Sequence, residues 1–206
     1  MRNKLIILAG SSGSGKTTIA QKIAEKFKKS QVQIICLDHF YKPDNILKKM
    51  FDNHPNHDHP SSFDWKLLKS VLRKLLFGQL ADIPVYDYST NTRTTKSIKI
   101  KPSKILILEG TLALYDKVIR KWASLKVFVD TPLDECFIRR LERDVTERNR
   151  TRQSVIKKWH QTVRPMFFEF VWRESEMADI ILPWYQTNPR GLETLFNAMK
   201  TIIVKK

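Results

Sequence analysis

One segment near the start of the chain restricts the fold more than any other: residues 10–17, with the sequence Gly-Ser-Ser-Gly-Ser-Gly-Lys-Thr. The apolar residues 5–9 before it predict a buried strand, and apolar residues recur at helical spacing from Ile19 to Phe27. A glycine-rich loop between a strand and a helix points backbone N–H groups and the helix N-terminus at a polyphosphate. A flexible Gly/Ser linker is the competing interpretation, but the core-forming elements on both sides argue against it.

The loop therefore predicts a site for a nucleoside triphosphate. In this motif the lysine, here Lys16, reaches the β and γ phosphates, and the hydroxyl of Thr17 ligates Mg²⁺. The residues expected to bind the triphosphate are Gly10, Ser11, Ser12, Gly13, Ser14, Gly15, Lys16, Thr17 and Thr18.

Apolar runs along the rest of the chain predict strands that alternate with helices. Because this order is typical of a parallel sheet with helices on both faces, the sequence predicts an α/β fold. Ligands of such sheets bind beyond the carboxyl ends of the strands, so polar residues that follow the strands are site candidates. Besides residues 5–9, buried strands are expected at 32–37, 105–108, 127–129 and 180–182.

The remaining segments predict helices, a hairpin and one long loop. Residues 83–88 and 97–101 predict a hairpin that projects from the core, and the polar stretch from Tyr41 to Ser62 predicts a loop. Helices are expected at 67–76, at roughly 133–148 and 152–175, and from about residue 191 onward.

Composition favours a single α/β domain in the cytoplasm. The chain has 206 residues and 42% hydrophobic content, and no apolar run approaches the roughly 18 residues that span a bilayer. Cys36 and Cys136 lack metal-ligand spacing and are expected to be reduced thiols. The net charge of +16 invites a nucleic-acid interpretation. The lysines are spread along the chain, however, so the charge is assigned to solvated surface that attracts anionic substrates, and nucleic acid is not expected as a partner.

Two acidic residues follow predicted strands at the expected phosphate site. Asp38 comes after the strand that follows the loop helix, where a carboxylate can accept a proton from an attacking hydroxyl. Glu109 comes after four apolar residues, where an acid can bind Mg²⁺ through water. A capping aspartate and a surface glutamate are the alternative interpretations, and the strand-end positions favour the catalytic and metal roles.

The polar loop and the hairpin supply candidate groups for a second substrate. The carboxylate of Asp58 can accept hydrogen bonds from two vicinal hydroxyls, as on a ribose. The histidines around it lack a cysteine partner and the helical spacing of a zinc site, so no zinc is expected. Tyr86 and Tyr88 lie two residues apart and hence on one face of a strand, which can flank a planar base or form an ordinary tyrosine pair.

Arginines and acids are interspersed between residues 139 and 152. The excess of arginine near the end of this segment, which includes Arg150, favours a lid that closes over phosphates and stabilises transition-state charge. Part of the segment is also typical of a helix with surface ion pairs. Three pairs have the required i, i+4 spacing: Arg140–Asp144, Arg143–Glu147 and Asp144–Arg148.

Taken together, these segments resemble the uridine–cytidine kinase family of P-loop small-molecule kinases. They run in the family's order from residue 5 to about residue 183, so the resemblance covers most of the chain. The matching pieces are residues 10–17, Leu37-Asp-His-Phe-Tyr41, Asp58-His-Pro60 with Phe63-Asp64, Pro84-Val-Tyr-Asp-Tyr88, Leu108-Glu-Gly110, Phe128-Val-Asp-Thr131 and the arginine-rich segment 139–150.

The resemblance implies ATP-dependent phosphorylation of a nucleoside 5′-hydroxyl, in the salvage of pyrimidines. It also implies a three-layer P-loop kinase fold with a central parallel sheet, with residues 1–206 as one domain. A projecting β-hairpin at about 83–101 would bind the acceptor, and an Arg-rich helical lid would lie at about 139–152. Family members are commonly homotetramers and are inhibited by pyrimidine triphosphates, so the resemblance implies a homo-oligomer.

The same resemblance implies roles for individual residues. Asp38 is the base that activates the 5′-hydroxyl, and Thr17 and Glu109 hold magnesium. The other residues implied to be catalytic are Lys16, Arg140 and Arg150. The residues implied to bind the nucleoside are Asp38, Tyr41, Asp58, Tyr86, Tyr88, Asn91, Arg140, Arg150 and Lys158.

Two positions depart from the family's pattern where the base is expected. Asn91 stands where many relatives have a histidine, and its amide can meet either O4 of uracil or the 4-amino group of cytosine. Lys158 stands where some members have a glutamine, and lysine only donates hydrogen bonds, which favours a carbonyl.

Two alternative functions follow from the same residues. The first is a kinase for another hydroxyl acceptor, such as a nicotinamide riboside or a pantothenate-like compound. The second is a non-catalytic nucleotide- or RNA-binding protein on a kinase fold. The presence of the catalytic lysine, the threonine and both strand-end acids argues against the second, because a degenerate kinase usually loses one of them.

Overall fold

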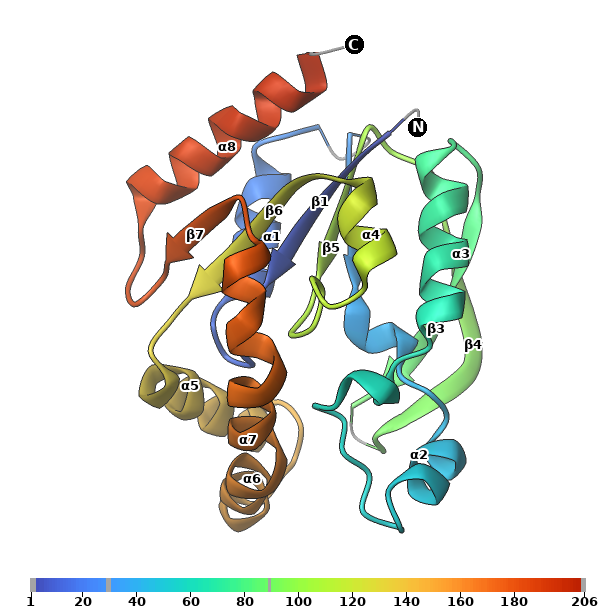
Figure 1. Cartoon of the computed structure of the whole chain (residues 1–206), viewed down its shortest axis with the longest axis vertical. Coiled ribbons are helices and arrows are strands. Elements are labelled where there is room, and N and C mark those ends of the chain that lie inside the picture. Colours follow the sequence, from blue (N-terminus) through green and yellow to red (C-terminus); the bar gives the residue numbers. More distant parts are fainter. Residues whose placement is uncertain (1–2, 29–30, 89, 205–206) are drawn as a thin grey trace.

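The computed structural model describes residues 3–28, 31–88 and 90–204. At its centre lies a parallel sheet whose strands all run in the same direction (Figure 1). The five strands are β1 (Lys4–Ala9), β2 (Val32–Cys36), β5 (Ile105–Glu109), β6 (Ala123–Asp130) and β7 (Ile180–Pro183). Their order across the sheet is β2–β5–β1–β6–β7, so the predicted central parallel sheet is confirmed.

Alternate residues of β1 face opposite sides of the sheet, and each set belongs to a different hydrophobic core. Ile6 and Leu8 pack on one side, and Leu5 and Ile7 pack on the other. Because helices cover both faces, the strand is apolar throughout and the predicted three-layer arrangement is confirmed. The first side is covered by α1 (Lys16–Glu25) and α8 (Pro189–Val204), and the second by α3 (Trp65–Leu76) and α4 (Lys117–Trp122).

The predicted hairpin forms a separate antiparallel sheet of β3 (Ala81–Asp87) and β4 (Thr92–Ile100). Ile83 and Ile100 join the same core as α3, so one end of the hairpin is anchored to the body of the molecule (Figure 1). β4 begins at Thr92 and not at residue 97; residues 92–97 are polar, so this part of the strand looked like a turn in the sequence. Residue 89, in the predicted hairpin, lies outside the described residues.

Two short helices were not expected from the sequence. α2 (Asp44–Met50) lies within the predicted loop and buries Leu47. A helix with one buried side chain has no apolar stripe, which explains why its spacing was not recognised. α4 has six residues and is capped by Asp116, whose carboxylate accepts from the backbone N–H groups of Val118 and Ile119 at 2.8 and 3.0 Å.

The two arginine-rich helices are present, but the second is irregular. Its centre contains Pro165, which has no backbone N–H, and wider π-type turns flank this position. No helix within the described parts of the chain is long and apolar enough to cross a membrane. The first helix is α5 (Leu133–Thr146); the second runs through α6 (Arg152–Lys158), a π segment (Trp159–Val163), α7 (Arg164–Met166), a second π segment (Phe167–Val171) and a 3₁₀ segment (Trp172–Met177).

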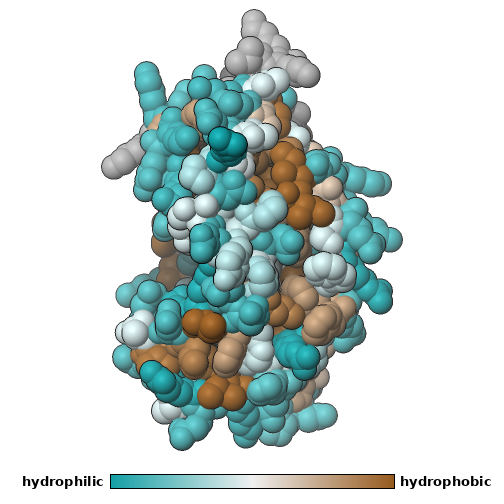
Figure 2. Space-filling model, turned by 90° about the vertical axis from the view of Figure 1, so that its left-hand side faces the viewer, coloured by the Kyte–Doolittle hydropathy of each residue, from teal (hydrophilic) through white to brown (hydrophobic). Residues whose placement is uncertain are grey.

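Hydrophilic side chains dominate the face that lies at the left of Figure 1, and smaller hydrophobic areas interrupt them (Figure 2). This distribution agrees with the assignment of charged residues to the solvated surface.

Both cysteines are free thiols. Cys136 is fully buried and Cys36 is half-buried.

Candidate active site

The glycine-rich loop between β1 and α1 is held in one backbone conformation by close contacts. Gly13 has a positive φ of 87°, and a Cβ atom there would lie 2.3 Å from the carbonyl oxygen of Cys136. Only glycine therefore fits this position. Lys16 folds back over the loop, where its Nζ atom donates to the carbonyl oxygen of Ser11 at 2.8 Å. The loop is thus a fixed cradle with a buried lysine beside it.

A hydroxyl and a carboxylate meet next to this lysine. Thr17 Oγ1 donates to Glu109 Oε1 at 3.1 Å, and Glu109, the last residue of β5, is only 4% exposed. Burial raises the pKa of Glu109 and lowers that of Lys16, and the opposite charges of the two groups partly offset both shifts.

These two oxygen-bearing side chains fit a magnesium ion, because Mg²⁺ prefers oxygen ligands. Among the described side chains, no three histidine, cysteine, aspartate or glutamate residues gather into a metal-binding group. A magnesium ion at Thr17 and Glu109 would therefore take its other ligands from phosphate oxygens and water, which is its usual behaviour.

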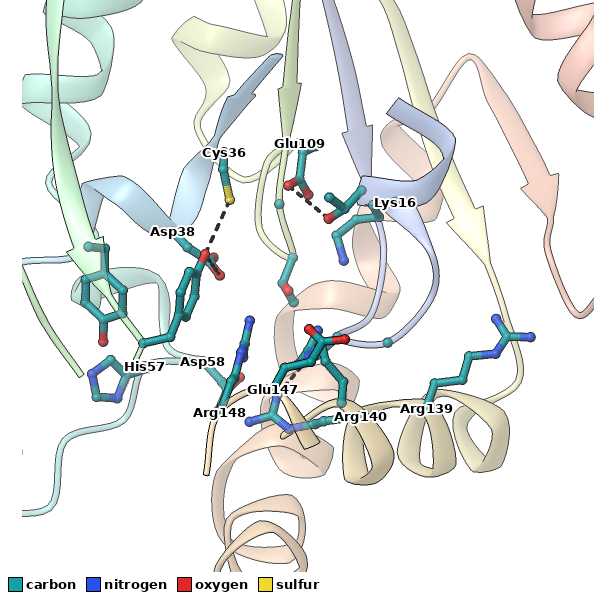
Figure 3. Close-up of a pocket in the computed structure, with 18 of the residues that line it drawn as sticks. Lys16, Cys36, Asp38, His57, Asp58, Glu109, Arg139, Arg140, Glu147 and Arg148 are labelled. Atoms are coloured by element: carbon teal, nitrogen blue, oxygen red, sulfur yellow. Dashed lines mark hydrogen bonds between the residues drawn. The ribbon is translucent and has the colours of Figure 1, made fainter. Parts of the chain in front are cut away.

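A cavity of about 730 Å³ extends from the loop toward the hairpin (Figure 3). Three of the predicted loop residues, Gly10, Ser11 and Ser14, are buried and do not line this cavity. The other predicted site residues all line it: Ser12, Gly13, Gly15, Lys16, Thr17, Thr18, Asp38, Tyr41, Asp58, Tyr86, Tyr88, Asn91, Glu109, Arg140, Arg150 and Lys158.

Asp38 lies in the 3₁₀ turn (Leu37–Phe40) that follows β2, and a tyrosine from the hairpin orients its carboxylate. Tyr88 OH donates to Asp38 Oδ2 at 3.3 Å and lies 3.8 Å from Cys36 Sγ. The guanidinium of Arg148 covers the ring of Tyr88 at 4.2 Å from its centroid. Burial and the nearby Asp38 charge raise the pKa of Tyr88, so its hydroxyl keeps its proton and remains a donor.

Aromatic side chains form the end of the cavity that is farther from the loop. The ring of Tyr41 stacks on Phe63 at a centroid distance of 4.5 Å and lies 5.0 Å from that of Tyr86. His57 meets Tyr41 edge-on at 5.2 Å. Burial, followed by the positive charge of Lys158, lowers the pKa of His57 to about 4, so this ring is neutral at physiological pH.

Asp58 connects the polar loop to the irregular second helix. Its Oδ2 atom accepts a hydrogen bond from Thr162 Oγ1 at 2.8 Å, and both residues line the cavity. Lys158 lies one turn earlier in the same helical run, and its backbone carbonyl also accepts from Thr162. This helical run and the polar loop therefore form two walls of the same cavity.

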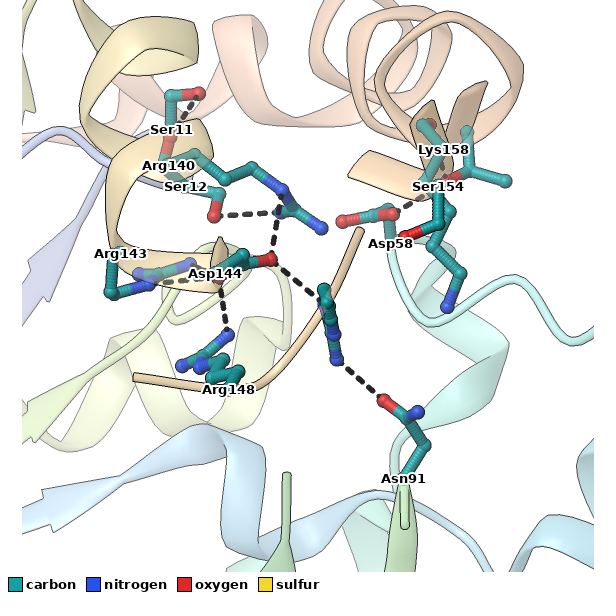
Figure 4. A network of polar contacts seen from close by, with 12 residues as sticks. Ser11, Ser12, Asp58, Asn91, Arg140, Arg143, Asp144, Arg148, Ser154 and Lys158 are labelled. Carbon is teal, nitrogen blue, oxygen red and sulfur yellow. Dashed lines mark hydrogen bonds and ion pairs between the residues drawn. The ribbon is translucent and has the colours of Figure 1, made fainter. Parts of the chain in front are cut away.

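A single buried carboxylate organises the arginine-rich segment (Figure 4). Asp144 has no exposed surface, and its oxygens lie between 2.8 and 3.7 Å from four guanidinium groups. Two of the expected ion pairs are confirmed, but Arg143 pairs with Asp144 instead of Glu147 because the buried carboxylate lies closer to its guanidinium. The four guanidinium groups belong to Arg140, Arg143, Arg148 and Arg150.

The cluster around Asp144 contacts both ends of the cavity. Arg140 Nη1 donates to Ser12 Oγ of the glycine-rich loop at 2.8 Å. Arg150 Nη2 donates to Asn91 Oδ1 in the hairpin at 2.6 Å. The arginines thus connect the glycine-rich loop, the hairpin and the helix that carries the cluster.

Several cavity residues were not identified as site residues from the sequence. Thr162 gave no signal because a lone threonine in a helix is common. Asp144, which is buried behind the arginines and does not line the cavity, looked like one partner in an ordinary ion pair. His57 was considered only as a zinc ligand, although its Nε2 atom is buried without a hydrogen-bond partner in the described part of the chain. Its position directly before Asp58 was the one available hint. Cys36 also lines the cavity, because it ends β2 just before Asp38.

Comparison with known proteins adds a family assignment to this geometry. A profile of the Phosphoribulokinase / Uridine kinase family matches residues 5–189. The uridine kinase of Ureaplasma parvum serovar 3 is 41% identical over 199 residues, which cover 96% of each chain. The uridine kinase of Shewanella pealeana is 45% identical over 183 residues, which cover 87% of each chain.

Solved structures share the fold at much lower sequence identity. The phosphoribulokinase of Rhodobacter spheroides superposes with a TM-score of 0.64 and 18% identity, over 88% of this chain and 70% of that one. The D-glycerate 3-kinase of Cryptococcus neoformans superposes with a TM-score of 0.60 and 17% identity, over 81% and 78% of the two chains. These likenesses show a common kinase fold.

Proposed function

The chain belongs to the phosphoribulokinase/uridine kinase family, and we propose that it transfers the γ-phosphoryl group of ATP to the 5′-hydroxyl of uridine or cytidine. Curated relatives that are uridine kinases and match almost the whole chain support a nucleoside as the acceptor. The observation that carries the proposal is that one cavity joins the glycine-rich loop, the Asp38 carboxylate and an aromatic end.

Phosphoryl transfer needs little covalent chemistry from the protein, so positioning and charge do most of the work. Asp38 Oδ accepts the proton of the 5′-hydroxyl as the hydroxyl oxygen forms a bond to the γ-phosphorus. The bond between the γ-phosphorus and the β–γ bridging oxygen breaks, and ADP leaves with that oxygen. Lys16 and the arginines of the Asp144 cluster balance the negative charge of the transferring group.

Magnesium is the cofactor that this site fits. Thr17 and Glu109 would hold it, and when bound it neutralises charge on the phosphates of ATP. Glu109 is well suited to this role because its carboxylate is buried and has a hydroxyl and an ammonium group as neighbours.

The acceptor end supplies groups that match a nucleoside. Asp58 can accept hydrogen bonds from the 2′- and 3′-hydroxyls of a ribose in place of the one that it receives from Thr162. Tyr41 and Tyr86 offer aromatic surface to a planar base. Lys158, Asn91 and the nearby arginines are the remaining polar groups there.

We further propose that residues 1–206 form one kinase domain, in which residues 83–101 are the acceptor-binding hairpin and residues 139–152 are the lid. We also propose that the protein acts in the cytoplasm, where ATP and nucleosides are available, and that it forms a homo-oligomer, such as the tetramer that is common among uridine–cytidine kinases. Analytical ultracentrifugation of the purified protein tests the oligomeric state.

The replacement Asp38→Asn tests the function directly. It keeps the shape of the side chain and its contact with Tyr88 but removes the proton acceptor, so we expect kcat for uridine to fall by about 10²–10⁴-fold. ATP binding, measured by calorimetry, should be unchanged because Asp38 does not hold the triphosphate. Near-normal turnover by this variant would contradict the assignment of the base, and a wild-type enzyme inactive on both pyrimidine nucleosides would contradict the proposed acceptor. A panel with nicotinamide riboside and pantothenate would then identify the acceptor class.

A further inference from the structure

One hydroxyl group at the acceptor end has two hydrogen-bond acceptors within reach and only one hydrogen atom to donate. Thr162 Oγ1 lies 2.8 Å from Asp58 Oδ2 and 3.1 Å from the backbone carbonyl oxygen of Lys158. The contact with the carboxylate is the shorter of the two, and hydrogen bonds to a charged acceptor are stronger than those to a neutral one. The hydrogen atom of this hydroxyl therefore points to Asp58 in preference to the carbonyl.

The backbone of the second helix holds the oxygen of this hydroxyl in a fixed position. Thr162 lies in the π segment Trp159–Val163, and both end residues of that segment are buried in a small core with Cys136 of α5. Its contact with the carbonyl four residues earlier is one that a threonine in a helix commonly makes. Because Thr162 also lines the cavity, the helix presents a rigidly placed hydroxyl to it.

Asp58 has an anchored backbone, but its side chain depends on Thr162. The backbone N–H of Asp58 donates to Asn56 Oδ1 at 3.1 Å. Within the described parts of the chain, the hydroxyl of Thr162 is the one group that hydrogen-bonds to the Asp58 carboxylate. The carboxylate lies beside the helical run that carries Lys158 (Figure 4). Thr162 therefore decides how the Asp58 carboxylate is turned within the cavity.

A nearby cation would compete for this carboxylate if the hydroxyl were missing. The ammonium group of Lys158 lies within electrostatic range of Asp58, and both side chains line the cavity. An ammonium group has three donors, so it can occupy carboxylate oxygens that a substrate needs. A diol would then have to break this ion pair before it could bind. The hydrogen bond from Thr162 keeps the carboxylate available.

The second acceptor of Thr162 becomes important when a diol binds to Asp58. The two hydroxyls of the diol take the place of the hydrogen bond from Thr162, whose hydrogen atom then needs another acceptor. The carbonyl oxygen of Lys158 is 3.1 Å away, so rotation about the bond between Cβ and Oγ1 is sufficient. No heavy atom has to move and no polar group is left unpaired, which avoids the usual cost of losing a hydrogen bond.

We propose that Thr162 is a positioning residue for the acceptor. Its hydroxyl holds the Asp58 carboxylate ready for the 2′- and 3′-hydroxyls of the nucleoside and turns to the carbonyl of Lys158 when they bind. This inference rests on the proposed nucleoside kinase function and adds a residue that acts through Asp58. A group that is already oriented loses less freedom on binding, which increases affinity. The effect should therefore appear in the KM for uridine and not in kcat or in the KM for ATP.

The replacement Thr162→Val tests this role because valine has nearly the same shape and no hydroxyl. We expect the KM for uridine to rise by about threefold to tenfold, the effect of one hydrogen bond, with kcat and the KM for ATP almost unchanged. Thr162→Ser keeps the hydroxyl and should restore the wild-type KM for uridine.

Thr194→Val is the matched control, because it removes a hydrogen bond to the carbonyl four residues earlier on the exposed face of α8, and it should behave as the wild type. An unchanged KM for uridine in Thr162→Val would overturn the inference. A lower KM would also overturn it, since Thr162 would then compete with the acceptor instead of preparing its site.

An acceptor without the diol separates positioning from a structural role. We expect the inhibition constant of 2′,3′-dideoxyuridine, measured against uridine, to be the same in the wild type and in Thr162→Val, because this compound has no hydroxyls for Asp58. A general disturbance of the cavity would weaken both compounds equally, and that result would overturn the inference while leaving the proposed function intact. Absence of turnover of uridine and cytidine by the wild type would overturn the proposed function and the inference with it.

Discussion

The two ends of the cavity are built in different ways. The donor end consists of one continuous segment, residues 10–18, whose shape comes from backbone contacts such as that between Gly13 and the carbonyl group of Cys136. The acceptor end is assembled from separate segments: the turn after β2, the polar loop, the hairpin, the arginine-rich segment and the irregular second helix. Side-chain contacts, rather than backbone contacts, hold these segments together. The main ones are those of Asp144 and its four arginines.

This difference predicts different kinds of tolerance. A backbone cradle for phosphate depends on a few residues and fails when any one of them changes. An acceptor end built from side chains from many segments can be altered in preference without loss of the reaction. Substitutions at the donor end should therefore abolish activity. Substitutions at the acceptor end should instead change the rate of the reaction, the selectivity for the acceptor or the pH dependence.

The largest effect is expected for Lys16→Ala at the donor end. Lys16 is buried, and its ammonium group contacts the backbone of the loop, so its loss should lower kcat by about 10³-fold. Steady-state kinetics with saturating uridine measures this change. Lys22→Ala, on an exposed position of the same helix, is the matched control and should retain activity. If kcat of Lys16→Ala fell by less than tenfold, the expectation that substitutions at the donor end abolish activity would be wrong.

The next effect is expected for Asp144→Asn in the arginine cluster. The change leaves four guanidinium groups around a neutral side chain, so we expect the free energy of unfolding to fall by about 1–3 kcal/mol, less than for a fully buried pair because the arginines are partly exposed. Misplaced arginines should also lower kcat by about tenfold. Urea denaturation and steady-state kinetics measure the two effects. Glu142→Gln, exposed on the same helix, should change neither, and an unaltered Asp144→Asn enzyme would contradict the organising role of Asp144.

A smaller effect is expected for Tyr88→Phe, which removes the hydroxyl that donates to Asp38 Oδ2. The phenylalanine ring can still pack beneath Arg148. Because the hydrogen bond orients the proposed proton acceptor, Asp38, we expect kcat to fall by about fivefold to tenfold with little change in KM for ATP. Tyr115→Phe, at an exposed position, is the control. A change confined to the KM for uridine would instead assign Tyr88 to base contact alone.

The smallest effect concerns pH and His57. Because its pKa falls from the ordinary value of 6.5 to about 4 in the folded protein, the unfolded chain binds more protons between these values. Stability therefore falls as the pH drops through this window. Between about pH 7 and about pH 5, we expect the melting temperature of His57→Phe to fall by less than that of the wild type. His54→Phe, an exposed neighbour, should follow the wild type, and identical pH dependence in all three proteins would contradict the burial of His57.

Much of the fold and the donor end was predictable from sequence because the signals are local. The strand, loop and helix of residues 5–27 are adjacent in the chain, and the apolar strands recur with the spacing of a sheet covered on both faces. Asp38 and Glu109 were proposed as site residues for the same reason, because each comes directly after an apolar run in the sequence. The short helices α2 and α4 and the pitch changes around Pro165 were not predicted, because they depend on packing rather than on apolar spacing.

The sequence by itself determined that the chain forms a parallel sheet with a phosphate-binding loop and two strand-end acids, because periodicity and short motifs encode backbone geometry. Only the tertiary structure decided what the acceptor end presents to a base. The sequence indicated two of the four arginine pairs of Asp144, but not that Arg143 and Arg150 share this carboxylate or that Arg150 turns the oxygen of Asn91 toward itself. Arg150 and Asn91 are distant in sequence, so their contact exists only once the chain has folded.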